Sequence, residues 1–355
     1  MDAPTVNLQA KKSAEEVVMW GKMHINIRMV GEGVIVDKLL SLAAKEGTST
    51  IGGVKYGGME LLQRFLGSIL AMVRAEYAGQ RIDELVISLK NLEMKLLEGL
   101  TASVEALGIP RGNVHIASHT ECFVYYVLNQ RRDVWGGQVG MFSLSDEDLR
   151  YYELKVTRGP RQMTAIAEHE ELEEGFSLSV LDTGSGAKMA DKILCACGER
   201  FLQKKIFSSI FLTGKGFART DWAPEFMKQI CNRRRVFVET AIFAKGAAMK
   251  AEEYLDERGS GAFVCLCEGK LKSTVSLEVM KREAKTDIEL ASAGESWYEA
   301  RSVVESDPGR GEGDLLYDYT AAGAEEKTDR EDSPWRDFRS ARIRRRRPGG
   351  CGIFR

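Results

Sequence analysis

The stretch that decides the fold is IFSSIFLTGKGF, residues 206–217. Its apolar run up to Leu212 predicts a buried strand that ends at a glycine-containing turn. Glycine at such a turn lets the backbone approach a ligand closely, because no Cβ intervenes. The same letters also fit an ordinary turn from a strand into a helix. The stretch therefore predicts a buried strand of an α/β protein, with one candidate binding turn at its end.

Strands and helices alternate on both sides of this stretch. The acidic turn between residues 138–144 and 149–156 indicates a hairpin, and alternating residues beyond Gly259 predict a mainly β ending at 263–267 and 274–279. This order favours α/β layering in two related halves. The other predicted strands are 85–89, 114–117 and 235–238, and the predicted helices are 92–107, 120–129, 187–203, 223–231 and 241–255.

Composition bounds the class of protein. With 355 residues, 44% hydrophobic and 29% charged, the chain has enough apolar material for about two domains, which excludes wholesale disorder. A net charge of −2 argues against a generally basic nucleic-acid binder. The sequence contains neither a signal peptide pattern nor an apolar stretch of membrane-helix length. Seven cysteines without framework spacing fit a reduced compartment, so we expect a cytoplasmic protein without a membrane partner.

The C-terminal tail has a different composition. Apolar residues fall to 16 of the 55 from Arg301 onward, and from Trp335 there are eight arginines against one acid. Such a segment buries little surface, so we expect a packed region ending near Ala300 and a disordered tail at 301–355. The arginine run Arg342–Arg347 could bind nucleic acid or an anionic membrane surface through its charge. It lacks the interleaved aromatic residues that stack on bases, and a tail without a partner fits equally well.

A second glycine-rich loop, Asp182–Gly186, precedes the helix predicted from Ala187. Backbone amides at a glycine-rich helix start can hold an anion. The loop also fits a simple helix start with Ser185 as the capping residue, which is the interpretation we favour.

Cysteines and histidines supply weaker candidates. On a strand, Cys265 and Cys267 would face the same side and could share a metal, whereas on a helix Cys195 and Cys197 would diverge. Because zinc sites commonly use C-x-x-C spacing, small buried core residues are the favoured role for both pairs. His119 and Glu121 form either an acid–base pair or the start of a helix. The sequence thus predicts neither a catalytic residue nor a metal site.

Three segments resemble a known family: residues 211–217, 231–237 and 243–248. They are similar to an uncharacterised domain-of-unknown-function family of anaerobic Gram-positive bacteria. The members of that family resemble the superfamily of actin, sugar kinases and heat-shock-chaperone ATPases. The likeness extends over roughly residues 30–300, and its supporting segments are 33–40, 50–56, 85–88, 119–121 and 293–300.

The resemblance implies an α/β, actin-like two-lobed ATPase-type fold with an incomplete first lobe, and a degenerate nucleotide site. Thr213, Gly214 and Gly216 would contact the adenosine, and Gly246 would lie in a helix beneath them. The expected division is a first lobe at 1–157, a second lobe at 158–258, a β-rich segment at 259–300 and a basic tail at 301–355.

Departures from the superfamily decide the expected function. The chain starts too late to hold the first phosphate hairpin. In the second hairpin, Phe142–Asp146 places neither a carboxylate nor a glycine at the positions that would contact phosphate. Without these groups neither Mg²⁺ nor the developing charge on the γ-phosphate is held, so we expect no bound cofactor and no catalysis. The tail after Ala300 reads like an out-of-frame or truncated product.

The leading hypothesis is a catalytically silent scaffold or regulatory protein with an unknown protein partner. Two alternatives stay open. One is a weak ATP-binding protein or sugar-kinase-like phosphotransferase. The other is an interaction module whose basic tail binds nucleic acid.

Overall fold

The computed structural model describes residues 36, 38–146, 148–159, 162–255, 263–281, 284–306, 315–320 and 342–345. The N-terminal part of the predicted first-lobe segment 33–40 lies outside these residues, apart from Val36. The chain divides into two compact units. The first consists of residues 1–154 and 169–260, and the second of residues 155–168 and 261–355.

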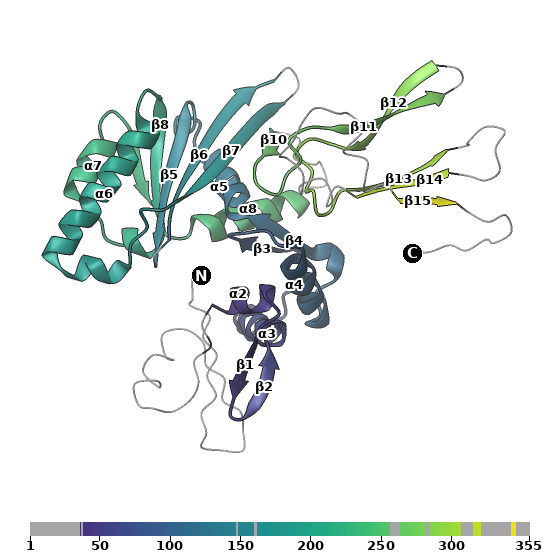
Figure 1. The fold of residues 1–355 in the computed structure, drawn as a ribbon, viewed down its shortest axis with the longest axis horizontal. Helices are drawn as coiled ribbons and strands as arrows, with labels where there is room; N and C mark the ends of the chain where they lie inside the picture. The colour runs from purple at the N-terminus through teal and green to yellow at the C-terminus, as the bar shows by residue number, and fades with distance from the viewer. Residues whose placement is uncertain are drawn as a thin grey trace. The chain divides into compact units, whose positions relative to one another are not determined.

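The first unit begins with helices and two small sheets (Figure 1). Strands β1 and β2 form an antiparallel hairpin, and β3 pairs with β4 in parallel, with Leu85 opposite Val114. The strand at 85–89 and the helix that follows it are therefore confirmed. The elements are α2 (Leu39–Ala44), β1 (Thr48–Ile51), β2 (Val54–Gly57), α3 (Gly58–Glu76), β3 (Leu85–Leu89), α4 (Met94–Ala106), β4 (Val114–Ser118) and α5 (His119–Leu128).

The rest of the first unit is built around a mixed sheet. Its strands run in the order β6-β5-β8-β9, with β5 antiparallel to β6 and parallel to β8, which is in turn parallel to β9. The α/β class, the hairpin and the strand from the opening stretch are confirmed. The elements are β5 (Gln138–Ser145), β6 (Asp148–Arg158), β7 (Met163–Leu172), α6 (Gly184–Leu202), β8 (Phe207–Thr213), α7 (Pro224–Ile230), β9 (Arg235–Val238) and α8 (Ile242–Leu255). Residues 155–158 of β6 and 163–168 of β7 belong to the second unit.

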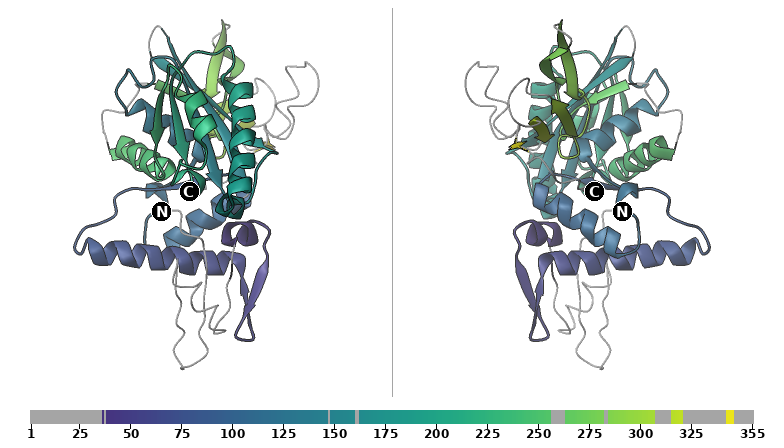
Figure 2. Two further views of the ribbon diagram at one scale, coloured as in Figure 1. Left: turned by 90° about the vertical axis from the view of Figure 1, so that its left-hand side faces the viewer. Right: turned by 90° about the vertical axis from the view of Figure 1, so that its right-hand side faces the viewer.

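Helices cover both faces of this sheet (Figures 1 and 2). On one face, Phe142 belongs to a buried cluster with Leu194 of α6 and Phe226 of α7. On the other face, Phe211 packs edge-on against Phe123 of α5, with ring centroids 6.5 Å apart. Alternate strand residues point to opposite faces, which explains how β5 and β8 serve both layers.

Residue-level expectations for the core are met with one exception. Phe211 and Leu212 are buried in β8, and Ala247 of α8 packs in a buried cluster with Ala117. A helix packed beneath the turn, as the resemblance implies, predicts that Ala248 also faces the sheet, but Ala248 is exposed. Neighbouring residues on a helix are turned by about 100°, so one alanine faces inward and the next faces solvent.

Local capping explains where the helices begin. The Ser118 hydroxyl accepts a hydrogen bond from the Glu121 N–H at 3.0 Å and starts α5. The Thr183 hydroxyl accepts from the Gly186 N–H at 3.1 Å and starts α6, so the capping residue is Thr183 and not Ser185.

The second unit holds only strands among its described residues. Strand β10 pairs in parallel with residues 163–166 of β7, and β11 pairs with β12. The three-stranded sheet β13-β14-β15 differs from the irregular backbone expected in the tail. Its residues, such as Val303-Val304 and Tyr317, are typical strand formers. The elements are β10 (Phe263–Leu266), β11 (Val275–Lys281), β12 (Ala284–Ala291), β13 (Arg301–Ser306), β14 (Leu315–Thr320) and β15 (Arg342–Arg345).

Candidate functional site

The turn after β8 packs onto the hairpin between β5 and β6. Gly214 has a φ of 89° and a ψ of 168°, and a Cβ on it would lie 2.3 Å from the Leu144 carbonyl oxygen. A Cβ on Gly216 would lie 2.4 Å from the Leu144 side chain. The structure therefore brings Thr213, Gly214 and Gly216 together, and both glycines are required for contact with the hairpin.

Gly246 serves a different contact. It lies within α8, and a Cβ there would be 1.9 Å from the Cys122 carbonyl oxygen of α5. The glycine thus allows the two helices to cross at close range. Its nearest neighbours come from α5 and not from the turn after β8.

Charged side chains gather at the start of β6 and form what we call the hairpin ion cluster: Lys90, Asp148, Arg150 and Glu171. The Asp148 carboxylate lies 2.7 Å from the Lys90 amine and 3.3 Å from the Arg150 guanidinium. Arg150 is only 3% exposed, and it also donates to Glu171 at 2.6 Å. A buried guanidinium with two carboxylate partners is a fixed part of the fold, because an unpaired one would carry a large desolvation cost.

Two histidines border the hairpin ion cluster. His119 stacks on Phe243 with ring centroids 3.9 Å apart. Burial, followed by the positive charges of Arg150 and Lys90, lowers the pKa of His119 to about 3. His169 contacts the Thr120 hydroxyl at 3.0 Å, and burial lowers its pKa as well. His119 is therefore neutral near pH 7 and poorly suited to act as a base, because it resists taking up a proton.

The proposed acid–base partner of His119 is engaged elsewhere. The Glu121 carboxylate accepts a hydrogen bond from the Lys250 amine at 2.6 Å, and both side chains are almost fully buried. The Lys250 amine also lies over the Tyr125 and Tyr254 rings. This ion pair joins α5 to α8, so the structure favours the helix-start interpretation of His119 and Glu121.

Three sequence candidates remain: the glycine-rich loop Asp182–Gly186, the arginine run of the tail and a metal site. A Cβ on Gly186 would lie 2.2 Å from the Val180 carbonyl oxygen, so the glycine-rich loop is packed against its own chain. In the part of the tail that the structure describes, Arg342–Arg345 form β15 and pair with β14. Within the described ranges, no group of three or more His, Cys, Asp or Glu side chains could hold a metal ion.

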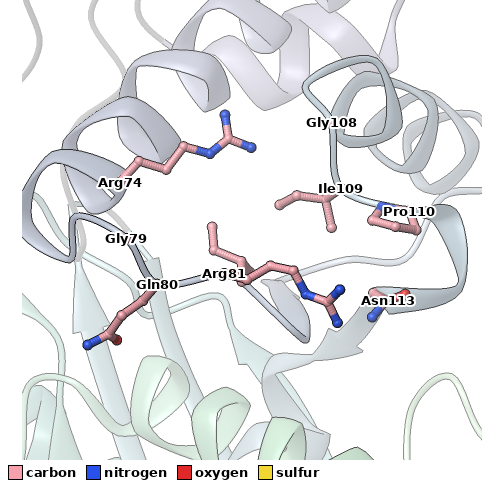
Figure 3. Close-up of a pocket in the computed structure, with 9 residues that line it drawn as sticks. Arg74, Gly79, Gln80, Arg81, Gly108, Ile109, Pro110 and Asn113 are labelled. Carbon is pink, nitrogen blue, oxygen red and sulfur yellow. The ribbon is translucent and has the colours of Figure 1, made fainter.

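A cavity of about 720 Å³ lies beside the end of α3. Figure 3 shows Arg74 on one side of it and Arg81 beside Asn113 on the other. Arg74 donates to the Leu107 carbonyl at 3.0 Å, and Arg81 donates to Asp83 at 3.0 Å. Both guanidinium groups are thus already used within the chain, and the cavity adds no reactive group.

Residues 2–268 match the family model described as family of unknown function (DUF5716) C-terminal. The chain belongs to this family. In this DUF5716 protein the match runs from before α2 to just beyond β10 and includes the hairpin ion cluster and the turn after β8. A comparison with proteins of curated function finds no match. Among the described residues, no helix is long and apolar enough to cross a membrane.

The hairpin ion cluster was not predicted from the sequence, although one signal was available. Arg150 lies two residues from Tyr152 and four from Leu154 on the same face of β6, and both of those residues are buried. A charged residue at an inward strand position indicates a buried ion pair. Its partners Lys90 and Glu171 come from distant segments, and nothing in the local sequence identifies them.

Proposed function

We propose that this DUF5716 protein has an actin-like ATPase-type fold, does not hydrolyse nucleotide, and acts in the cytoplasm as a scaffold or regulatory protein for a protein partner. The proposal rests first on the resemblance, which assigns the second phosphate element to the hairpin and the adenosine contact to Thr213, Gly214 and Gly216. The packing of Gly214 on Leu144 brings these two elements together, as a shared nucleotide site requires.

The observation that carries the non-catalytic part is the pairing of charges at the hairpin. Asp148 is paired with Lys90 and Arg150, and Asp146 lies 3.4 Å from the Lys215 amine. Lys90, Arg150 and Lys215 therefore already have carboxylate partners from the chain. A phosphate group would have to displace these carboxylates and would be repelled by them, whereas phosphoryl transfer depends on groups that hold phosphate and Mg²⁺.

Phosphate release from Mg-ATP by the purified full chain tests this proposal. We expect release equal to a buffer blank. Turnover above the blank that is lost in Gly214→Val would overturn the proposal and favour the weak ATPase or phosphotransferase alternative. Thermal unfolding of each variant controls for misfolding.

The scaffold role makes a second, separate expectation. Partner capture by the tagged full chain from its native cell extract should be unchanged when an ATP-degrading enzyme is added. Capture that requires ATP would contradict a nucleotide-independent scaffold. A chain that captures no protein under either condition would also contradict it.

A further inference from the structure

Two cysteines meet at the end of β10 in the second unit. Cys265 lies in β10 opposite Ala165 of β7, and Cys267 is the first residue of the turn that follows. The Lys270 N–H donates to the Cys267 carbonyl at 3.1 Å, and Gly269 has a φ of 86°. The turn therefore places Cys267 next to the strand that carries Cys265.

The two sulfur atoms are 3.5 Å apart and are not joined by a disulfide. A disulfide bond is about 2.05 Å long, so the sulfurs need to approach by about 1.5 Å to form one. Cys267 lies at a bend after the strand has ended, where the backbone can supply part of this movement. Both side chains are buried, which favours reaction with each other over a lasting adduct with a larger reagent.

Cys195 and Cys197 provide a matched pair with the same spacing on a helix. The Cys195 thiol is directed to the Asp191 carboxylate at 3.9 Å, and Cys197 packs in the core with Phe226. Burial raises the pKa of both thiols to about 11, which leaves little thiolate to react. Equal spacing in the sequence therefore gives the two pairs different neighbours in the fold: Cys265 and Cys267 contact each other, whereas Cys195 is directed to Asp191.

A closed metal site does not explain the Cys265–Cys267 pair. Two thiols fill only half of a tetrahedral zinc site, and the described residues offer no third His, Cys, Asp or Glu ligand in a suitable group. The short distance between the sulfurs leaves direct bond formation as the chemistry that they can carry out by themselves.

We propose that Cys265 and Cys267 are a dithiol modification site that a low-molecular-mass disulfide oxidises reversibly to an intrachain disulfide. One cysteine thiolate attacks the disulfide reagent and forms a mixed disulfide, and one reagent thiol leaves. The second cysteine attacks the protein sulfur of that mixed disulfide, and the second reagent thiol leaves. Two protein thiols lose two electrons and two protons, and the reagent disulfide takes them up as two thiols.

Oxidised glutathione is the probe. One tryptic digest reports on the Cys265–Cys267 pair, on the Cys195–Cys197 pair and on Cys231. The full chain is reduced, exposed to the probe, denatured, alkylated and digested. Cys265 and Cys267 share the peptide Gly259–Lys270, Cys195 and Cys197 share Ile193–Arg200, and the exposed Cys231 lies in Gln229–Arg233. Mass spectrometry then separates alkylated, glutathione-bound and disulfide-closed forms.

We expect the Gly259–Lys270 peptide to become disulfide-closed roughly tenfold faster than the Ile193–Arg200 peptide. Reducing agent should reverse the closure, and Cys267→Ser should abolish it while the thermal midpoint of the variant stays near that of the parent chain. In urea the two pairs should react alike, because the fold no longer distinguishes them.

Two results would overturn the proposal. One is a Gly259–Lys270 peptide that stays fully alkylated while Cys231 acquires glutathione. The other is equal closure of both pairs in the folded chain.

Discussion

At the scale of single residues, Gly214 has the most demanding backbone conformation in the candidate site. Its φ and ψ lie in a region that is essentially restricted to glycine, and Leu144 blocks the position of a Cβ. We expect Gly214→Ala to lower the free energy of unfolding by more than the about 1–3 kcal/mol that such backbone strain costs alone. Urea unfolding followed by circular dichroism measures the loss.

Gly53 is a control for Gly214 at a similar φ. Its φ is 86°, but nothing lies within 4 Å of the position that a Cβ would take. Gly53→Ala should therefore show only the cost of the backbone conformation. Equal losses for the two variants would mean that the contact between Gly214 and the hairpin contributes nothing to stability.

His119 makes stability depend on pH. Its pKa is about 3 in the folded chain against 6.5 for an ordinary histidine. Between these values the unfolded chain binds a proton that the folded chain does not. The free energy of unfolding therefore falls as pH falls through this window, by up to about 1.4 kcal/mol per pH unit from this residue. Above pH 6.5 this contribution is fully present.

His119→Phe tests this dependence, because it keeps an aromatic ring against Phe243 and removes the titrating group. The free energy of unfolding of the variant should depend less steeply on pH between 6.5 and 3 than that of the parent chain. Some dependence should remain, because the pKa of His169 is also lowered. An unchanged slope would show that His119 is protonated in the folded chain.

At the scale of elements, the packing of α8 discriminates between two adjacent alanines. Ala247 is buried beside Ala117 and Cys122, whereas Ala248 is exposed. We expect Ala247→Leu to overpack this contact and lower the free energy of unfolding by about 1–3 kcal/mol. Ala248→Leu should change it by less than about 0.5 kcal/mol, as is usual for surface positions. A reversed order in chemical denaturation would mean that α8 presents a different face.

The ion pair between α5 and α8 gives a second prediction at this scale. Lys250→Met leaves the buried Glu121 carboxylate without its charged partner and should cost about 3–5 kcal/mol. Adding Glu121→Leu should recover most of that loss, because the pair is then replaced by apolar groups. A double variant no more stable than Lys250→Met alone would contradict this account.

Strands and helices with a strong pattern could be predicted from the sequence, and those with a weak pattern could not. β3 and β8 are continuous apolar runs, and α4 shows clear 3.6-residue spacing. β7 was missed, because its inward residues at 165 and 167 are alanines and the residues that follow them are mostly charged. The glycine turn at 214–216 was recognised as special, but its partner Leu144 is about 70 positions away in the sequence and no local pattern identifies it.

At the scale of the whole molecule, we propose that the β5–β6 hairpin and the turn after β8 form a nucleotide-type site. Its space and its charged groups are already taken up by other residues of the chain. The hairpin carboxylates are paired with Lys90, Arg150 and Lys215, and the turn glycines contact Leu144. The DUF5716 family is described as one of unknown function, so membership in it assigns no activity to this site. The claim therefore depends on whether nucleotide binds at all.

The most direct test is the thermal midpoint of the full chain with and without millimolar Mg-ATP. Ligand at about 100 times its dissociation constant stabilises the folded state by about 2.7 kcal/mol, which a midpoint readily detects. Our account predicts an unchanged midpoint in the parent chain. A rise that is lost in Gly214→Val but kept in Gly53→Val would contradict it, because nucleotide would then occupy the site that the chain was inferred to fill.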